Sequence, residues 1–263
     1  MLRPASAPLV KAMHMRWIVA LRRFDYARKY RIRHPGEDVP AEVLYYLHIG
    51  KTGGTFFKKT VKDAGTFTHE PMLLIPLGHN IKHQHLPRGS RFILGTRAPD
   101  SRFVSGFLSR RRRGTTGRNR QSRAERAAFA RFDGPNALAE ALDAPDAPTR
   151  RAARAAMRAI RHVNEPHTLW FPDRARLAGD IAAGRVYRVR QEHLVADMRA
   201  VFAATGFDLA PDKLDSRPRA HAAPAGADKH LSARARANLR EHYAGDYAFL
   251  DWLDARGLTG AAG

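Results

Sequence analysis

The sequence predicts an α/β protein with a parallel central sheet flanked by helices. Residues 43–49 form an almost unbroken apolar and aromatic run, which is typical of a strand buried on both faces. A glycine-rich turn and a helical pattern follow this run directly. Strand patterns then alternate with helical patterns along the chain, and this order favours a parallel sheet covered on both faces.

The remaining elements are read from periodicity and from their end signals. Gly206 is expected to end one helix and Ser232 to cap the closing helical segment, which runs through Trp252. Residues 210–229, rich in proline, alanine and aspartate, are expected to form a loop. The further strands are expected at residues 72–75, 91–95 and 186–190, and the helices at residues 56–64, 100–109, 148–163, 175–183 and 194–205.

The length of 263 residues, of which 44% are hydrophobic, allows one substantial core. We expect a basic N-terminal extension over residues 1–40 and a single domain over residues 41–263. Within the extension Trp17, Ala20, Leu21 and Phe24 recur at helical spacing and predict a short amphipathic helix. Packing on the domain is the expected role of this helix, and contact with a membrane surface is the alternative.

The charge balance is strongly basic, with 46 Lys and Arg against 25 Asp and Glu and a formal net charge of +21. Such a surface attracts nucleic acid, anionic lipid, acidic polysaccharide or a phosphorylated cofactor, although an arginine-biased genome explains the excess equally well. The absence of cysteine excludes disulfides, cysteine-ligated metals and cysteine nucleophiles. No signal peptide or membrane-spanning run is recognised, so a cytoplasmic protein is expected.

The glycine-rich turn at residues 50–55 lies between the first strand and a helix. A helix N-terminus presents unpaired N–H groups and a partial positive charge, so this arrangement favours an anion site. Gly53 and Gly54 let the backbone approach the anion closely. Side-chain donors come from Lys51, Thr52 and Thr55.

The turn differs from a Walker A phosphate loop. Gly50-Lys51-Thr52 fits the end of the pattern G-x-x-x-x-G-K-[ST], but Tyr45 stands where the first glycine is required. Two glycines follow the lysine instead of preceding it. This departure, and the lack of a clear Walker B acid, weigh against a nucleotide-dependent kinase.

Residues 48–55, His-Ile-Gly-Lys-Thr-Gly-Gly-Thr, closely resemble the H-I-P-K-T-G-G-T signature of sulfotransferases that use 3′-phosphoadenosine 5′-phosphosulfate (PAPS). The resemblance is to the branch that acts on carbohydrates and membrane glycans. It implies a P-loop-like fold, PAPS as co-substrate, no metal, and a loop that grips the 5′-phosphosulfate. Gly50 replaces the usual proline, and Lys51 is expected to neutralise the leaving phosphate. The implied cofactor contacts are Lys51, Thr52, Gly53, Gly54, Thr55 and Phe56.

Residues 97–105 resemble a second family segment, R-D-P-x-x-R-F-x-S, which binds the 3′-phosphate. This resemblance assigns Arg97 and Ser105 to that phosphate, and Arg102 either assists them or orients the helix. Ala98 replaces the usual aspartate at a position outside the presumed contacts. The likeness spans roughly residues 43–250, sharply in the two motifs and loosely elsewhere.

A general base must take the proton of the acceptor. His79, His83 and His85 cluster before the third strand, and a histidine pKa near neutrality suits the task. Residues 83–87 resemble the family segment that carries the base in uronyl 2-O-sulfotransferases, so His85 is the first candidate and His83 the second. Glu70 is the rival, since another glycan branch uses a glutamate soon after the loop. The other readings of the histidines are a surface cluster and a zinc pair at i, i+2 that lacks its other ligands.

The predicted function is transfer of a sulfuryl group from PAPS to a hydroxyl of a carbohydrate or glycolipid acceptor. The alternatives are a P-loop kinase and a basic nucleic-acid-binding protein, but the sequence has no recognisable nucleic-acid-binding motif. His167 and Trp170 lie where related sequences contact acceptor, although core packing is expected for Trp170. Residues 110–131 hold nine arginines, and the first half is expected to be a mobile loop that covers the cofactor, holds an anionic acceptor or is simply solvated.

Overall fold

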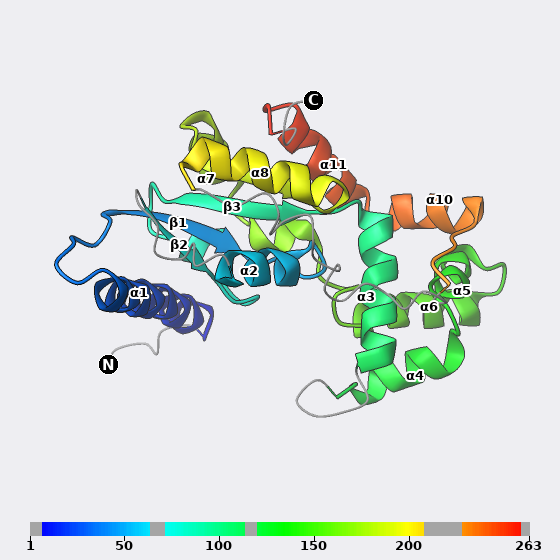
Figure 1. Cartoon of the computed structure of the whole chain (residues 1–263). Helices are drawn as coiled ribbons and strands as arrows, with labels where there is room; N and C mark the ends of the chain where they lie inside the picture. The colour runs from blue at the N-terminus through cyan, green and yellow to red at the C-terminus, as the bar shows by residue number, and fades with distance from the viewer. Residues whose placement is uncertain (1–6, 64–71, 114–119, 208–227, 259–263) are drawn as a thin grey trace, which may run out of the picture. The chain divides into compact units, whose positions relative to one another are not determined.

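The computed structural model describes residues 7–63, 72–113, 120–207 and 228–258 of the chain (Figure 1). The chain divides into two compact units. The sheet unit comprises residues 1–96, 169–220 and 253–263, and the helical unit comprises residues 97–168 and 221–252.

A four-stranded, entirely parallel sheet organises the sheet unit. Its strands follow the order β2-β1-β3-β4, so β1 and β3 are central. The strands are β1 (Glu42–Leu47), β2 (Met72–Pro76), β3 (Arg91–Thr96) and β4 (Val186–Arg190). The predicted α/β class with a parallel sheet flanked by helices is therefore confirmed, and each predicted strand is present.

The helices agree with the sequence patterns in most places. Gly206 adopts a left-handed conformation that ends α8, and the Ser232 hydroxyl accepts the Ala235 N–H at the start of α10, as predicted. The short helix α5 was not predicted. The helices are α1 (Ala7–Arg33), α2 (Gly54–Asp63), α3 (Pro99–Arg113), α4 (Arg123–Arg131), α5 (Pro135–Glu140), α6 (Ala147–Ala159), α7 (Arg174–Ala182), α8 (Leu194–Thr205), α10 (Ala233–His242) and α11 (Ala244–Asp254). The 3₁₀ turns are η2 (His83–His85), η4 (Ala141–Asp143), η5 (His167–Trp170) and η6 (Gln191–His193).

One face of the sheet is covered by α2 and α8. Side chains two residues apart on a strand share a face, and Leu44 and Tyr46 of β1 both enter this core. The ring of Tyr46 stacks on Phe57 of α2, with ring centroids 3.9 Å apart, and Met198 and Phe202 of α8 belong to the same cluster. Burial of each large apolar side chain contributes about 1.5–3 kcal/mol, so this core fixes α2 and the turn before it.

Helix α1 packs with a different face from the predicted one. It lies along β2 and η2, on the side of the sheet opposite α8 (Figure 1). The residues buried on α1 are Met15, Val19, Tyr26 and Tyr30. Trp17, Leu21 and Phe24, expected to pack on the domain, are exposed. The expectation was wrong because α1 carries two apolar faces, and the periodicity of one does not exclude the other. No described helix is long and apolar enough to cross a membrane.

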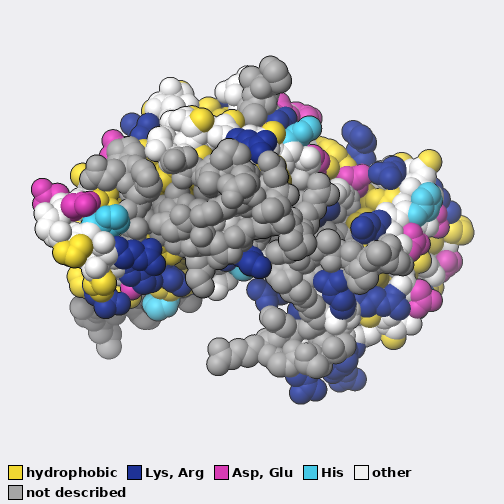
Figure 2. Space-filling model, viewed as in Figure 1, with side chains coloured by type: hydrophobic (Ala, Val, Ile, Leu, Met, Phe, Trp, Pro, Cys, Tyr) yellow, Lys and Arg dark blue, Asp and Glu magenta, His cyan; other side chains and the backbone are white. Residues whose placement is uncertain are grey.

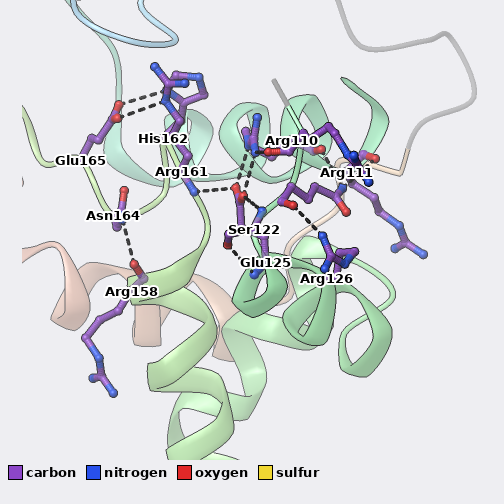
Figure 3. A network of polar contacts seen from close by, with 12 residues as sticks. Arg110, Arg111, Ser122, Glu125, Arg126, Arg158, Arg161, His162, Asn164 and Glu165 are labelled. Atoms are coloured by element: carbon purple, nitrogen blue, oxygen red, sulfur yellow. Dashed lines mark hydrogen bonds and ion pairs between the residues drawn. The ribbon is translucent and has the colours of Figure 1, made fainter. Parts of the chain in front are cut away.

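The helical unit holds a buried ion pair between α3 and α4 (Figure 3). The Arg110 Nε and Nη2 atoms each lie 2.7 Å from a carboxylate oxygen of Glu125. The backbone N–H groups of Ser122 and Arg161 also donate to this carboxylate. Burial alone would raise the pKa of Glu125, but these donors and the Arg110 charge lower it to about 2.

This ion pair corrects the expectation for the arginine-rich tract. Residues 110–113 form the end of α3, and residues 123–131 form α4. Between the two helices, residues 114–119 lie outside the described part of the chain. The Arg110 side chain is buried and forms an ion pair with Glu125. Arg111 and Arg112, its neighbours in the tract, are exposed. Because nothing in the sequence distinguishes Arg110 from these neighbours, its structural role could not be predicted.

Glu125→Gln should lower the free energy of unfolding by about 3 kcal/mol at pH 7, because it leaves the Arg110 guanidinium buried without a counter-ion. The lowered pKa of Glu125 stabilises the native state above pH 4.5, and this contribution is lost as the pH falls toward 2. The difference between wild type and variant should shrink over that window in urea denaturation. Glu241→Gln, the same change at an exposed site, is the control. Equal stability of the two variants would contradict this account.

Candidate functional site

The loop that joins β1 to α2 forms the candidate site. It leaves β1, a central strand, at the carboxyl end, where parallel sheets commonly bind ligands. The first hydrogen bond of α2 runs from the Phe57 N–H to the Gly53 carbonyl, 3.1 Å away. The N–H groups of Gly54, Thr55 and Phe56 therefore have no acceptor within the helix, and they favour an anion at its N-terminus.

Two residues in left-handed conformations, Lys51 and Gly53, shape the backbone of the loop. Lys51 adopts a left-handed conformation with φ of 69°, and Gly53 adopts one with φ of 85°. A lysine in this region is strained by roughly 1–2 kcal/mol, whereas glycine is not. Strain of this kind persists only where the surroundings impose it, and it is concentrated at functional sites.

Three close approaches impose this conformation. A Cβ on Gly54 would lie 2.1 Å from the ring of His48, which is buried beneath the start of α2. A Cβ on Gly95, near the end of β3, would lie 2.5 Å from the Thr52 hydroxyl oxygen. On Gly53 it would lie 2.4 Å from the side chain of Gln191 in η6. The loop is thus held against the ends of three strands.

The two threonines of the loop differ in their surroundings. Thr52 is fully buried, and its hydroxyl donates to the Ile49 carbonyl over 3.0 Å. That proton holds the turn closed. Thr55 is half-buried in the first turn of α2, so the geometry favours Thr55 as the hydroxyl donor for a ligand. Cofactor binding by Thr52 stays a prediction.

Two histidines lie beside the loop. The rings of His48 and His79 are in contact, with centroids 3.8 Å apart. His79 follows β2 and is half-buried, and Trp170 donates its indole N–H to the His79 carbonyl over 3.2 Å. Trp170 is buried, in keeping with the predicted packing role. From sequence, His48 was placed in the loop motif and His79 in the histidine cluster, but neither was assigned as the base, because only the sheet register brings the ends of β1 and β2 together.

His85, the predicted base, is buried in η2. Its Nδ1 atom accepts the Lys82 N–H over 3.0 Å, so the neutral ring carries its hydrogen on Nε2. Burial, reinforced by the charges of Lys82 and Arg16, lowers its pKa. With its lone pair used by the backbone, His85 is poorly arranged to accept a proton in this geometry, and its role as base stays a prediction.

His83 lies near the amino end of β3, whereas the loop lies at the carboxyl ends of the strands. Its Nε2 atom is 2.8 Å from an Asp180 carboxylate oxygen, and its ring packs against Phe92 and Phe171. Burial lowers its pKa, although the hydrogen bond to Asp180 opposes this shift. Phe92 is near the start of β3, so the structure does not bring His83 to the loop. Glu70, the rival base, lies outside the described residues.

The second predicted phosphate contact belongs to the helical unit. The Arg97 Nε donates to the Ser101 hydroxyl over 2.8 Å, just before and within the first turn of α3. Ser105 is one turn further on and shares this helix face with Ser101. All three side chains are half-buried. Ser101 was missed by the sequence reasoning, although its i, i+4 spacing to Ser105 was a usable signal.

Arg102 and His167 have other positions in the helical unit. Both are buried and converge on Asp246, with Arg102 Nη1 at 3.9 Å and His167 Nδ1 at 2.9 Å from the same carboxylate oxygen. This favours the structural alternative for Arg102, which orients α3. Contact of His167 with an acceptor is not supported by its full burial.

Comparisons with protein-family models, with curated proteins and with solved structures found no match to this chain. Among the described residues, no group of three or more histidine, aspartate or glutamate side chains could hold a metal ion.

Gly54→Ala should place a methyl group on the His48 ring and displace either that ring or the loop. We expect it to lower the free energy of unfolding by about 1–3 kcal/mol. His48→Ala removes the colliding ring, so the double variant should recover much of the loss that Gly54→Ala causes in wild type. A double-mutant cycle by urea denaturation measures this coupling. Additive effects of the two changes would show that the close approach is absent. Gly78→Ala, where nothing lies within 4 Å of the added Cβ, is the control.

Proposed function

We propose that the chain transfers a sulfuryl group from PAPS to a hydroxyl of a carbohydrate or glycolipid acceptor. The observation that carries the proposal is the loop after β1. It combines the free end of α2, a left-handed Lys51 and a glycine pair held by close packing. Such a fixed set of donors is suited to the 5′-phosphosulfate, and its sequence is the part that resembles the sulfotransferase signature.

The reaction places charge where this loop has donors. The acceptor oxygen attacks sulfur in line, and the bond between sulfur and the bridging 5′-phosphate oxygen breaks. The electron pair of that bond stays on 3′-phosphoadenosine 5′-phosphate, the leaving group. Lys51 and the N-terminus of α2 stabilise this growing negative charge, and preorganised donors do so without rearrangement in the transition state. A base takes the hydroxyl proton of the acceptor.

His79 is the base that the geometry favours among the histidines. It contacts His48, which packs under Gly54, so its ring belongs to the surroundings of the loop. Half-burial leaves part of His79 accessible to an acceptor, whereas His83 and His85 are buried. The basic charge of the chain is compatible with an anionic glycan as acceptor.

The desulfated product, 3′-phosphoadenosine 5′-phosphate, should bind far more tightly than ATP, as measured by isothermal titration calorimetry. Lys51→Ala should lower this affinity by about 10- to 100-fold, since a charge-assisted hydrogen bond is worth about 1.5–3 kcal/mol. Lys51→Gly should bind as weakly while being at least as stable as wild type, because glycine relieves the left-handed strain.

The glycine variant separates loss of the amine from loss of the fold. Lys59→Ala, at an exposed site on α2, removes the same charge outside the loop and is the matched control. Equal binding of ATP by wild type would favour the kinase alternative. Unchanged affinity in both Lys51 variants would exclude the loop as the phosphosulfate site.

Arg97→Ala and Ser105→Ala should each weaken binding of 3′-phosphoadenosine 5′-phosphate, Arg97→Ala by about 10- to 100-fold. An analogue without the 3′-phosphate should bind both variants as well as it binds wild type. If the variants lose equal affinity for the two ligands, Arg97 and Ser105 do not bind the 3′-phosphate. The assignment of the loop to the 5′-phosphosulfate would be unaffected.

His79→Ala should depress turnover by about two to four orders of magnitude with little change in cofactor affinity. His85→Ala, His83→Ala and Glu70→Ala, tested in the same assay, cover the bases predicted from sequence. Turnover measured with a candidate acceptor, and affinity measured by calorimetry, separate chemistry from binding. An active His79→Ala enzyme would reject His79, and loss of turnover in Glu70→Ala alone would assign the base to Glu70.

A further inference from the structure

Helix α1 exposes a stripe of large apolar side chains, here called the outer stripe: Met13, Trp17, Leu21, Phe24 and Ile32. Each is 56–67% exposed. Their spacings of four, four, three and eight residues place them on one side of the helix. A contiguous exposed apolar stripe of this kind marks a surface that interacts with a membrane, another protein or a ligand.

The opposite face of α1 is already used. Met15, Val19, Tyr26 and Tyr30 are buried where α1 packs along the sheet unit. Rotating the helix to bury the outer stripe would expose these four side chains, so the stripe is not a core face left open by chance. It is presented outward by a helix anchored through its other side.

Basic residues accompany the stripe. The 27 residues of α1 include eight Lys and Arg but a single acid, Asp25. Asp25 is paired with Lys29 over 2.7 Å and lies 3.6 Å from Arg28. Arg28 and Arg31 are exposed on the side of the helix that carries the stripe. Figure 2 shows Lys and Arg side chains next to hydrophobic ones at the lower left, over α1.

We propose that the outer stripe of α1 binds the surface of an anionic lipid membrane, with the helix lying in the plane of the interface. Trp, Phe and Leu on one side with Arg and Lys around them are the composition of interfacial helices. Long arginine side chains reach lipid phosphates while the stripe enters the apolar boundary. The proposal does not depend on the proposed function.

Two other occupants fit less well. A second copy of the chain would bring two strongly basic helices together, and their like charges would repel. A nucleic acid would satisfy the arginines but would not remove a stripe of Met, Leu and Ile from water. Only a membrane accounts for both the apolar and the basic side chains.

The experiment is vesicle flotation of the full chain. Wild type should float with phosphatidylcholine vesicles that contain phosphatidylserine, far less with pure phosphatidylcholine, and less as salt rises. Trp17→Ser/Leu21→Ser/Phe24→Ser should lower the partition coefficient at least about 100-fold, since three large apolar side chains no longer leave water. Leu169→Ser, a change at an exposed apolar site outside α1, should leave it unchanged.

Charge is tested by a second pair of variants. Arg28→Gln/Arg31→Gln should weaken binding to anionic vesicles about 10- to 100-fold. Arg151→Gln/Arg154→Gln, the same charge loss at exposed sites on α6, should have a smaller effect. Equal effects of the two pairs would show that net charge, and not α1, directs binding.

Insertion is tested by fluorescence quenching with brominated lipid. Wild type should be quenched, whereas Trp17→Phe should still float but lose most of the quenching. Flotation of the triple serine variant as strongly as wild type would overturn the proposal. It would also be overturned if light scattering showed a wild-type dimer that the triple variant converts to a monomer, because the stripe would then be an interface between copies.

Discussion

The missing side chain at Gly54 is the feature on which the candidate site depends most directly. It lets the ring of His48 lie under the first turn of α2, closer than any Cβ would permit. Gly95 gives Thr52 the same access to the end of β3. These contacts pack the turn tightly against the ends of the strands. They hold Lys51 in a left-handed conformation that a lysine rarely adopts on its own. The loop is a product of sheet packing as much as of its own sequence.

A loop held in this way is suited to an anion because its donors are already in place. The N–H groups at the start of α2 point to one region, and no backbone rearrangement is needed when charge develops there. The stacking of Tyr46 on Phe57 ties α2 to β1 and so transmits the rigidity of the sheet to these donors. Residue types alone do not make the site; their fixed positions do.

Sequence patterns predicted the individual strands and the loop because the signals for both are local. The apolar run at 43–49 identifies a buried strand, and glycines identify the turn after it. The choice among histidines was not local: His79 reaches the loop only because β2 pairs with β1, whereas His85 is turned back onto the Lys82 backbone. Likewise, two apolar faces on α1 are visible in the sequence, but only the structure shows which one faces the sheet.

Amide hydrogen exchange of the loop tests the central claim most directly, because it reports on the N–H groups themselves and requires no acceptor. Peptides covering residues 49–57 should become strongly protected when 3′-phosphoadenosine 5′-phosphate is added, and much less protected with ATP at the same concentration. Peptides from α6, in the helical unit, serve as an internal reference. Absence of protection at residues 49–57 under saturating nucleotide, or protection only elsewhere in the chain, would contradict the assignment of this loop as the phosphosulfate site.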